Sequence, residues 1–185
     1  MKKGSFIYQY LFNPRTVGAV RPSSGFLSNK MVEGIKYKDT KYIVEYGPGT
    51  GVFTEKILER RNKETLVVVI ESNQAFYQVL KKKFNNVRNL IIIFGSAEHI
   101  EQYLKEYNIP YVDYIISGLP FASLPQNVSK EILSNTLKVL KTGGEFVTFQ
   151  YTKVKIPFLR NYFPNITVNR EFRNIPPAYI LHCKL

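Results

Sequence analysis

Two patterns of apolar residues alternate along the middle of the chain. Short, nearly continuous apolar runs are typical of buried strands and are found at 41–46, 66–71, 90–94, 112–117 and 145–151. Between them, apolar residues recur three or four positions apart, which predicts helices over 52–61, 72–84, 97–107 and 127–140. Strands that alternate with helices predict an α/β fold whose mostly parallel sheet is covered on both faces.

Local signals refine these boundaries. Ser72 is a plausible N-cap, and Phe76, Val79 and Leu80 would form the inward face of the helix that follows it. Residues 141–144 contain two glycines and predict a turn before the fifth strand. After Tyr151 the helical spacing disappears, and segments 166–172 and 179–183 predict two further strands, antiparallel at the sheet edge.

The first 40 residues differ from the rest. Residues 6–12 are aromatic and aliphatic, follow Lys2 and Lys3, and can form a short helix that ends at Pro14. Such a segment either lies in a lipid interface or packs on the domain. We therefore expect an N-terminal helical segment over 1–40, which caps the domain and is a candidate for membrane contact, and a main domain over 41–185.

Charge adds a second distinction between the middle and its flanks. The chain has 185 residues and a net charge of +12. Residues 1–41 carry +6, residues 42–150 only +1, and residues 151–185 carry +5. If the flanks meet, they form a positive face that attracts nucleic acid or an anionic lipid surface. The alternative is a solvated basic surface that serves solubility.

Composition excludes several classes of protein. Cys183 is the single cysteine, so the chain cannot form an internal disulfide, and this usage is typical of a reducing, cytoplasmic compartment. Its longest apolar run, Leu90–Phe94, is far shorter than the roughly 20 residues of a membrane-spanning helix. Two histidines and one cysteine do not make a zinc site, and we expect no metal.

The sequence Glu45-Tyr-Gly-Pro-Gly-Thr-Gly51 follows the first strand and carries the chemistry. Alternate glycines allow a sharp turn and a close ligand approach, although a purely structural turn would also explain them. Val52 stands where a dinucleotide fingerprint needs glycine, and no Gly-Lys-Ser/Thr follows to make a P-loop. Glu71 ends the next strand, where a carboxylate can accept hydrogen bonds from ribose hydroxyls.

The pattern E-x-G-x-G-x-G with an acid closing the next strand resembles the class I S-adenosylmethionine-dependent methyltransferases, which have a Rossmann-like fold. Residues 140–146 (LKTGGEF) resemble the turn before their fifth strand, and Gly95-Ser96-Ala97 stands where many members have Gly-Asp-Ala. Glu45 suits a cofactor with an ammonium group and a sulfonium centre. The resemblance implies a cofactor site made of Glu45, Gly47, Gly49, Thr50, Gly51, Glu71, Ser72, Ser96, Ala97 and Ser117.

The loop after the fourth strand is where members place the methyl acceptor. The rRNA adenine dimethylases have Asn-(Leu/Ile)-Pro-(Tyr/Phe) there, and its polar residue and aromatic ring hold a flipped adenine. Here Gly118 precedes Leu119-Pro120-Phe121, so the asparagine is missing. Those enzymes also carry a helical RNA-binding domain after the sheet, whereas this chain ends at Leu185.

A second family resembles the chain over most of its length, namely the compact bacterial phospholipid N-methyltransferases that act on phosphatidylethanolamine. The shared segments are 13–24, 44–54, 116–120, 144–151 and 176–178. This resemblance implies an N-terminal helix on an anionic membrane, and places Arg21, Ser23 and Ser24 against the cofactor. The prediction is an N-methyltransferase acting on an aminophospholipid, cytoplasmic and peripheral on the inner face of the membrane; the alternatives are an rRNA adenine N6-methyltransferase and a non-enzymatic cofactor-binding module.

Methyl transfer to an amine mainly needs proximity and orientation. We expect no dedicated base, because neither His99 nor His182 falls in a matching motif. Aromatic rings could surround the ammonium by cation–π contact, or simply pack in the core. The candidates for positioning the acceptor are Ser117, Gly118, Leu119, Pro120, Phe121, Tyr8 and Tyr151.

Overall fold

The computed structural model describes residues 25–185. The predicted helix over 6–12 and the candidate site residues Tyr8, Arg21, Ser23 and Ser24 lie outside these described residues.

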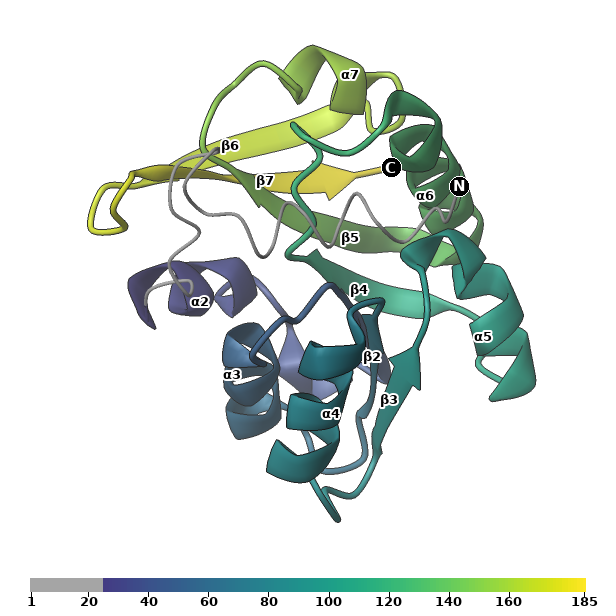
Figure 1. The fold of residues 1–185 in the computed structure, drawn as a ribbon. Helices are drawn as coiled ribbons and strands as arrows, with labels where there is room; N and C mark the ends of the chain where they lie inside the picture. Colours follow the sequence, from purple (N-terminus) through teal and green to yellow (C-terminus); the bar gives the residue numbers. More distant parts are fainter. Residues whose placement is uncertain (1–24) are drawn as a thin grey trace.

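One seven-stranded sheet has the order β3-β2-β1-β4-β5-β7-β6 (Figure 1). Its strands are β1 (Tyr42–Tyr46), β2 (Leu66–Glu71), β3 (Leu90–Phe94), β4 (Val112–Ser117), β5 (Leu140–Gln150), β6 (Asn165–Glu171) and β7 (Ala178–Lys184). Strands β1 to β5 pair in parallel, and β7 runs antiparallel to both of its neighbours. The predicted α/β fold with an antiparallel edge is confirmed.

Helices cover both faces of the sheet, which gives three layers (Figure 1). One face carries α2 (Gly25–Val32), α3 (Val52–Arg60) and α4 (Gln74–Lys83). The other carries α5 (Ile100–Glu106), α6 (Gln126–Val139) and α7 (Ile156–Arg160). Two short 3₁₀ turns, Tyr37–Asp39 and Ala97–His99, precede β1 and α5. The inner strands are therefore buried on both sides, as their continuous apolar sequences predict.

The start of α4 corrects one prediction. The N-cap is Asn73 rather than Ser72, since the Asn73 Oδ1 accepts hydrogen bonds from the backbone N–H groups of Ala75 and Phe76 at 2.9 and 3.1 Å. Val79 was expected to face inward but is 47% exposed. Only Leu80 of this helix is fully buried, because α4 covers the sheet with a narrow stripe.

Three further boundaries differ from the prediction. The segment 141–144 is no separate turn: α6 passes directly into β5, whose pairing with β4 is irregular where Gly143 adopts a φ of +75°. The predicted helix over 97–107 is a 3₁₀ turn followed by α5. The short helix α7 was not predicted, because its two buried residues, Ile156 and Leu159, are too few to make a period.

Helix α2 and the 3₁₀ turn Tyr37–Asp39 lie in the described part, residues 25–40, of the expected N-terminal segment. In α2, Leu27, Met31 and Val32 are completely buried and belong to the same cluster as Phe53 of α3. None of the helices within residues 25–185 has the length and apolar character needed to cross a membrane.

The parallel strands β1, β2, β4 and β5 all begin on one side of the sheet, which we call the amino edge. They all end on the opposite side, which we call the carboxyl edge. Near the amino edge the buried Asp113 accepts hydrogen bonds from the backbone N–H groups of Lys41 and Tyr42 at 2.9 and 2.8 Å and pairs with Lys141. The charges here have partners, and these contacts tie β1, β4 and β5 together.

A second carboxylate with charged partners, Glu145, lies where the continuous pairing of β5 with its two neighbouring strands begins. Glu145 contacts the Nδ1 atom of His182 at 2.5 Å and the Nζ atom of Lys184 at 3.4 Å. Burial would raise the pKa of Glu145, but the hydrogen bond and charge of His182 and the charge of Lys184 outweigh it and hold that pKa below its usual value.

Candidate functional site

The order of the strands reverses between β1 and β4. The chain leaves β1 toward β2 and β3 on one side, and leaves β4 toward β5 on the other. In open α/β sheets, ligands bind at the carboxyl edge beside such a reversal, where the two loops diverge. The loop after β1 is the glycine loop, residues 47–51, and the loop after β4 begins at Gly118, so both predicted loops meet at this point.

Every glycine of the glycine loop adopts a left-handed backbone. The φ angles are +61° at Gly47, +58° at Gly49 and +82° at Gly51, a region that side chains disfavour. A Cβ atom on Gly51 would also lie 2.7 Å from the ring of Phe84. The glycines therefore serve the turn and the packing of α3 against the end of α4.

The two loops come very close to each other. The backbone N–H of Gly118 donates to the carbonyl of Tyr46 at 2.8 Å. A Cβ atom on Gly118 would lie 2.6 Å from the carbonyl oxygen of Gly47, and one on Gly47 would lie 2.7 Å from the side chain of Leu119. Both positions require glycine, and the carbonyl of Gly47 forms a wall shared by the two loops.

Two carboxylates bracket the glycine loop. Glu71, at the end of β2, accepts hydrogen bonds from the backbone N–H groups of Gly49 at 3.0 Å and Asn73 at 2.7 Å. Burial raises its pKa, although these backbone hydrogen bonds oppose the shift. Glu71 therefore anchors the loop and retains lone pairs that can accept further hydrogen bonds.

Glu45 is completely buried at the end of β1. The hydroxyl of Thr54 donates to its Oε2 atom at 2.6 Å, while its Oε1 atom has no partner among the described residues. Burial raises the pKa of Glu45 to about 8, with the nearby Glu71 adding to the effect and the Thr54 hydrogen bond opposing it. A cation at the loop would favour the ionised carboxylate.

Unpartnered polar atoms gather at the carboxyl edge. Within residues 25–185, four buried side-chain atoms lack a hydrogen-bond partner. They are Glu45 Oε1, Asn73 Nδ2 and Gln150 Nε2 at or just after the ends of β1, β2 and β5, and Ser129 Oγ in the first turn of α6. Such groups cost free energy unless something binds them, which is typical of a ligand site.

A pocket opens between the loops that follow β1, β2, β3 and β4. Its lining is formed by Gly47, Ile70, Ser72, Gly95, Ser96, Ala97, Leu119, Leu124 and Ile132. Five of the predicted site residues line it, and Ile70, Leu124 and Ile132 give it apolar walls that suit a flat ring. The hydroxyl of Ser96 lies within 2.8 Å of a carboxylate oxygen of Glu98 and caps the 3₁₀ turn, so its role is at least partly structural.

The other candidates lie around this pocket in different environments. Thr50 is exposed on the glycine loop, and Pro120 is half-buried after Leu119. Ser117 is buried at the end of β4, where its backbone carbonyl lies 3.3 Å from the Thr148 hydroxyl. Thr50 and Pro120 belong to the two loops and Ser117 ends β4, but none of the three lines the pocket.

The two aromatic candidates within residues 25–185, Phe121 and Tyr151, lie on opposite faces of the sheet. Phe121 is completely buried and packs edge to face on Phe146, with ring centroids 6.0 Å apart. Tyr151 packs against Phe149 in the cluster on the opposite face of the sheet. Phe121 therefore fits the core-packing alternative in this structure.

Several residues of the site escaped sequence reasoning. Thr54 and Asn73 position the two carboxylates, and Gln150 places a buried amide at the end of β5. Asn73 could have been recognised as a cap residue before a helix, but nothing in the sequence distinguishes Thr54 or Gln150 from ordinary helix and strand residues. Neither histidine lines the pocket, since His99 is exposed and His182 pairs with Glu145.

Solved structures share this fold. The precorrin-6y C5,15-methyltransferase of Geobacter metallireducens matches with a TM-score of 0.68 and 14% identity, covering 86% of this chain and 88% of that one. Aeropyrum pernix fibrillarin, solved with natively bound S-adenosyl-L-methionine, matches with a TM-score of 0.62 and 16% identity, covering 80% of this chain and 68% of that one. These structures show a shared Rossmann-like fold. Because the chain also matches a methyltransferase family model, it is an S-adenosylmethionine-dependent methyltransferase.

Sequence comparison gives the family. The model of the ribosomal RNA adenine dimethylase family matches residues 23–158, and the chain belongs to that family. The ribosomal RNA small subunit methyltransferase A of Mycoplasma capricolum is 35% identical over 79% of this chain, which spans only 53% of that relative. The ornithine lipid N-methyltransferase of Singulisphaera acidiphila is 29% identical over 97% of this chain and 94% of its own length.

The residues at the carboxyl edge fit this cofactor. The left-handed backbone at Gly47 and the close contact between Gly118 and the Gly47 carbonyl leave no room for side chains at these two positions. A buried carboxylate oxygen of Glu45, beside the loop, has no partner among residues 25–185. Backbone that approaches a ligand closely and a negative group that favours a cationic one are what S-adenosylmethionine requires.

Proposed function

We propose that this enzyme transfers methyl groups to the amine of an aminolipid, with phosphatidylethanolamine as the preferred acceptor. The observation that carries the proposal is the backbone contact at Gly118. In the family pattern an asparagine at this position helps to hold a flipped adenine. Here a Cβ atom at Gly118 would lie 2.6 Å from the Gly47 carbonyl oxygen, so a side-chain amide cannot stand there unless the loops move apart.

The aromatic ring that would stack on the adenine is also not accessible. The aromatic residue of that pattern corresponds to Phe121, whose ring is enclosed by Phe146 and the core. A base that has left its stack needs both a hydrogen-bond partner and a stacking surface. A lipid amine needs neither, and the near full-length match to a lipid N-methyltransferase supports the same choice.

The cofactor would lie along the carboxyl edge. In this proposal the glycine loop, Glu71 and the pocket around Ser72 and Ala97 hold it, and the field of Glu45 favours its positive charge. Bound there, S-adenosylmethionine supplies an electrophilic methyl group with a good leaving group. The chain contributes proximity and orientation, which is worth up to about 7–11 kcal/mol in well-oriented reactions.

The acceptor must arrive as a free amine. A primary amine with a pKa near 10.4 is mostly protonated at neutral pH, and neither histidine lines the pocket. The proton therefore passes to water before the amine docks. The two loops would hold that free amine in line with the methyl group that a bound cofactor would supply. We assign the buried amide of Gln150, at the end of β5, to the polar part of the acceptor.

The test uses labelled cofactor and three acceptors in parallel. Mixed micelles of phosphatidylethanolamine, micelles of an ornithine lipid, and protein-free ribosomal RNA are each incubated with the purified enzyme. We expect label in phosphatidylethanolamine. Label confined to RNA would overturn the proposal, and label confined to the ornithine lipid would overturn the preferred head group while keeping the lipid acceptor.

A further inference from the structure

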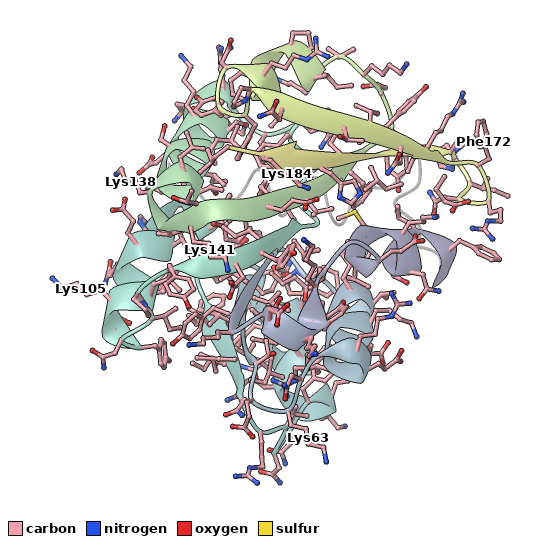
Figure 2. The ribbon with its side chains drawn as sticks, turned by 180° about the vertical axis from the view of Figure 1, so that it is seen from behind. Lys63, Lys105, Lys138, Lys141, Phe172 and Lys184 are labelled. Atoms are coloured by element: carbon pink, nitrogen blue, oxygen red, sulfur yellow. The ribbon has the colours of Figure 1, made fainter. Side chains whose placement is uncertain are left out.

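The hairpin between β6 and β7 ends in exposed apolar side chains. Phe172 is 66% exposed and Ile175 is 74% exposed, although both are large and hydrophobic. Figure 2 shows Phe172 at the far tip of the hairpin, pointing away from the body of the molecule. Val154, in the segment after β5, is 76% exposed, and Phe26 of α2 is 48% exposed. We call Phe26, Val154, Phe172 and Ile175 the tip patch.

Cationic side chains connect the members of the tip patch. The guanidinium of Arg173 lies 4.4 Å from the ring centroid of Phe26, and that of Arg170 lies 4.5 Å from that of Phe172. Arg170 and Lys153 also lie over Tyr179, at 5.3 and 5.2 Å. These contacts join α2, the segment after β5 and the hairpin into one surface on which apolar groups alternate with positive charge.

The charge balance of this surface is positive. Residues 151–185 carry six basic side chains and one acidic side chain, Glu171. Glu171 is buried and pairs with Arg173, and Glu33 of the neighbouring α2 end pairs with Lys30. Arg170 and Lys153 have no acidic partner in the described structure, so they remain available to an external anion.

The tip patch lies on the same edge of the sheet as the cofactor site. Gln150, the last residue of β5, pairs with Tyr179 of β7, and Glu171 pairs with Ala178. The turn between Glu171 and Ala178 therefore projects beyond the carboxyl edge, where the glycine loop also lies. A flat partner resting on the tip would therefore lie on the side of the sheet at which the site opens.

We infer that the tip patch docks on the surface of an anionic phospholipid bilayer, with Phe172 and Ile175 entering the interface and Arg170 and Lys153 meeting lipid phosphates. This deepens the proposed function and rests on it only for the acceptor. Aliphatic Ile175 and Val154 favour acyl chains, since they offer no stacking face to a nucleic-acid base. Side chains of this amphipathic kind bind membranes by apolar burial together with attraction to anionic lipid.

The chain lacks tryptophan, which allows a direct measurement. Phe172→Trp introduces a single tryptophan at the tip, whose emission can be excited selectively at wavelengths where tyrosine does not absorb. Tyr107→Trp is the matched control, because Tyr107 is 46% exposed just before β4, at the amino edge. Vesicles of phosphatidylethanolamine and phosphatidylglycerol, without cofactor, should shift the emission of the first variant to shorter wavelength and leave the second unchanged. Equal behaviour of both variants, or a shift produced by RNA but not by vesicles, would overturn the inference.

Vesicle sedimentation tests the energetics. The double variant Phe172→Ser/Ile175→Ser should bind these vesicles about tenfold or more weakly, since two apolar side chains are lost from the interface. Arg170→Gln should weaken binding about fivefold, with Lys63→Gln at the far end of the molecule as its control (Figure 2). Undiminished binding of the double variant would contradict the proposal.

Methylation of lipid dispersed in detergent micelles separates this inference from the proposed function. The double variant should keep the wild-type rate there, because the cofactor site is untouched. If the double variant loses vesicle binding but neither it nor the wild type methylates lipid, the proposed acceptor is wrong and the docking surface is supported. If the double variant methylates lipid and binds vesicles as the wild type does, the docking surface is wrong and the proposed acceptor is supported.

Discussion

The two edges of the sheet differ in how their polar groups are treated. Near the amino edge, Asp113 and Glu145 are buried and fully partnered by backbone N–H groups or by cations. At the carboxyl edge, Glu45 and Gln150 are equally buried, and each leaves an atom without a partner among the described residues. Polar groups near the amino edge hold strands together, whereas those at the carboxyl edge keep atoms that can form hydrogen bonds with a ligand. The following predictions test this division.

Removal of Asp113 should have the largest effect. Asp113→Ala leaves two buried backbone N–H groups and Lys141 without their acceptor, which we expect to lower the free energy of unfolding by about 4 kcal/mol. Urea denaturation measures this loss. Asp113→Asn, which retains one acceptor oxygen, should lose clearly less. If the folded alanine variant bound cofactor poorly, the amino edge would not be purely structural.

The two glutamates should respond to pH in opposite ways. Burial raises the pKa of Glu45 from 4.5 to about 8, so between these pH values the folded chain binds more protons than the unfolded chain. Glu45 therefore costs stability as pH rises through this window, on the order of 4 kcal/mol by pH 8. Glu45→Gln should remove that decline, which thermal unfolding across the pH range can detect.

Glu145 has a pKa below its usual value, so its contribution is present above the pKa of the unfolded chain and is lost as pH falls through the lowered pKa. Glu145→Gln should be less stable than the parent near neutral pH and match it in acid. Parallel pH profiles for the two glutamine variants would refute the distinction between the edges.

Crowding at the shared wall of the two loops should impair function more than stability. Gly118→Ala forces a Cβ atom against the Gly47 carbonyl, and we expect cofactor affinity to fall about hundredfold in calorimetry. The control is Gly143→Ala near the amino edge, where the left-handed φ of +75° is strained but nothing lies within 4 Å. That variant should lose about 1 kcal/mol of stability and keep its affinity. A reversed pattern would count against the site.

The smallest effect should come from Gln150. Gln150→Leu replaces an unpartnered buried amide by an apolar group of similar size, so stability should stay the same or rise slightly. The KM for the lipid acceptor should rise about tenfold, because a hydrogen bond to the acceptor is lost, with an unchanged Kd for the cofactor. Loss of stability with an unchanged KM would show that this amide is only structural.

The sequence was a good guide wherever one residue type has one physical meaning. Continuous apolar runs placed β2, β3 and β4 at their true bounds, and the alternate glycines located the loop after β1. Contacts between segments far apart in the chain could not be predicted from the sequence. The closeness of Gly118 to Gly47 depends on how two loops pack, and the exposure of Val79 depends on how much of the sheet α4 covers.

Segment 141–144 shows the same limit in another form. Its glycines predict a turn, but the residues on either side of it, Leu140 and Glu145, both pair with β4, so the segment is a bulge within β5 rather than a separate turn. Sheet pairing, which the local sequence does not contain, outweighs the local turn preference.

The place of β7 has a consequence for how the molecule is made. Although β7 follows β6 in the chain, it is inserted between β5 and β6, and within residues 25–185 β6 pairs with β7 alone. While the polypeptide is being synthesised, β6 must therefore wait for residues 178–184 before it can join its neighbours. A ribosome that stalls before Ala178 would leave β6 without a partner and one side of β5 unpaired, and the projecting hairpin would be among the last parts of the enzyme to form.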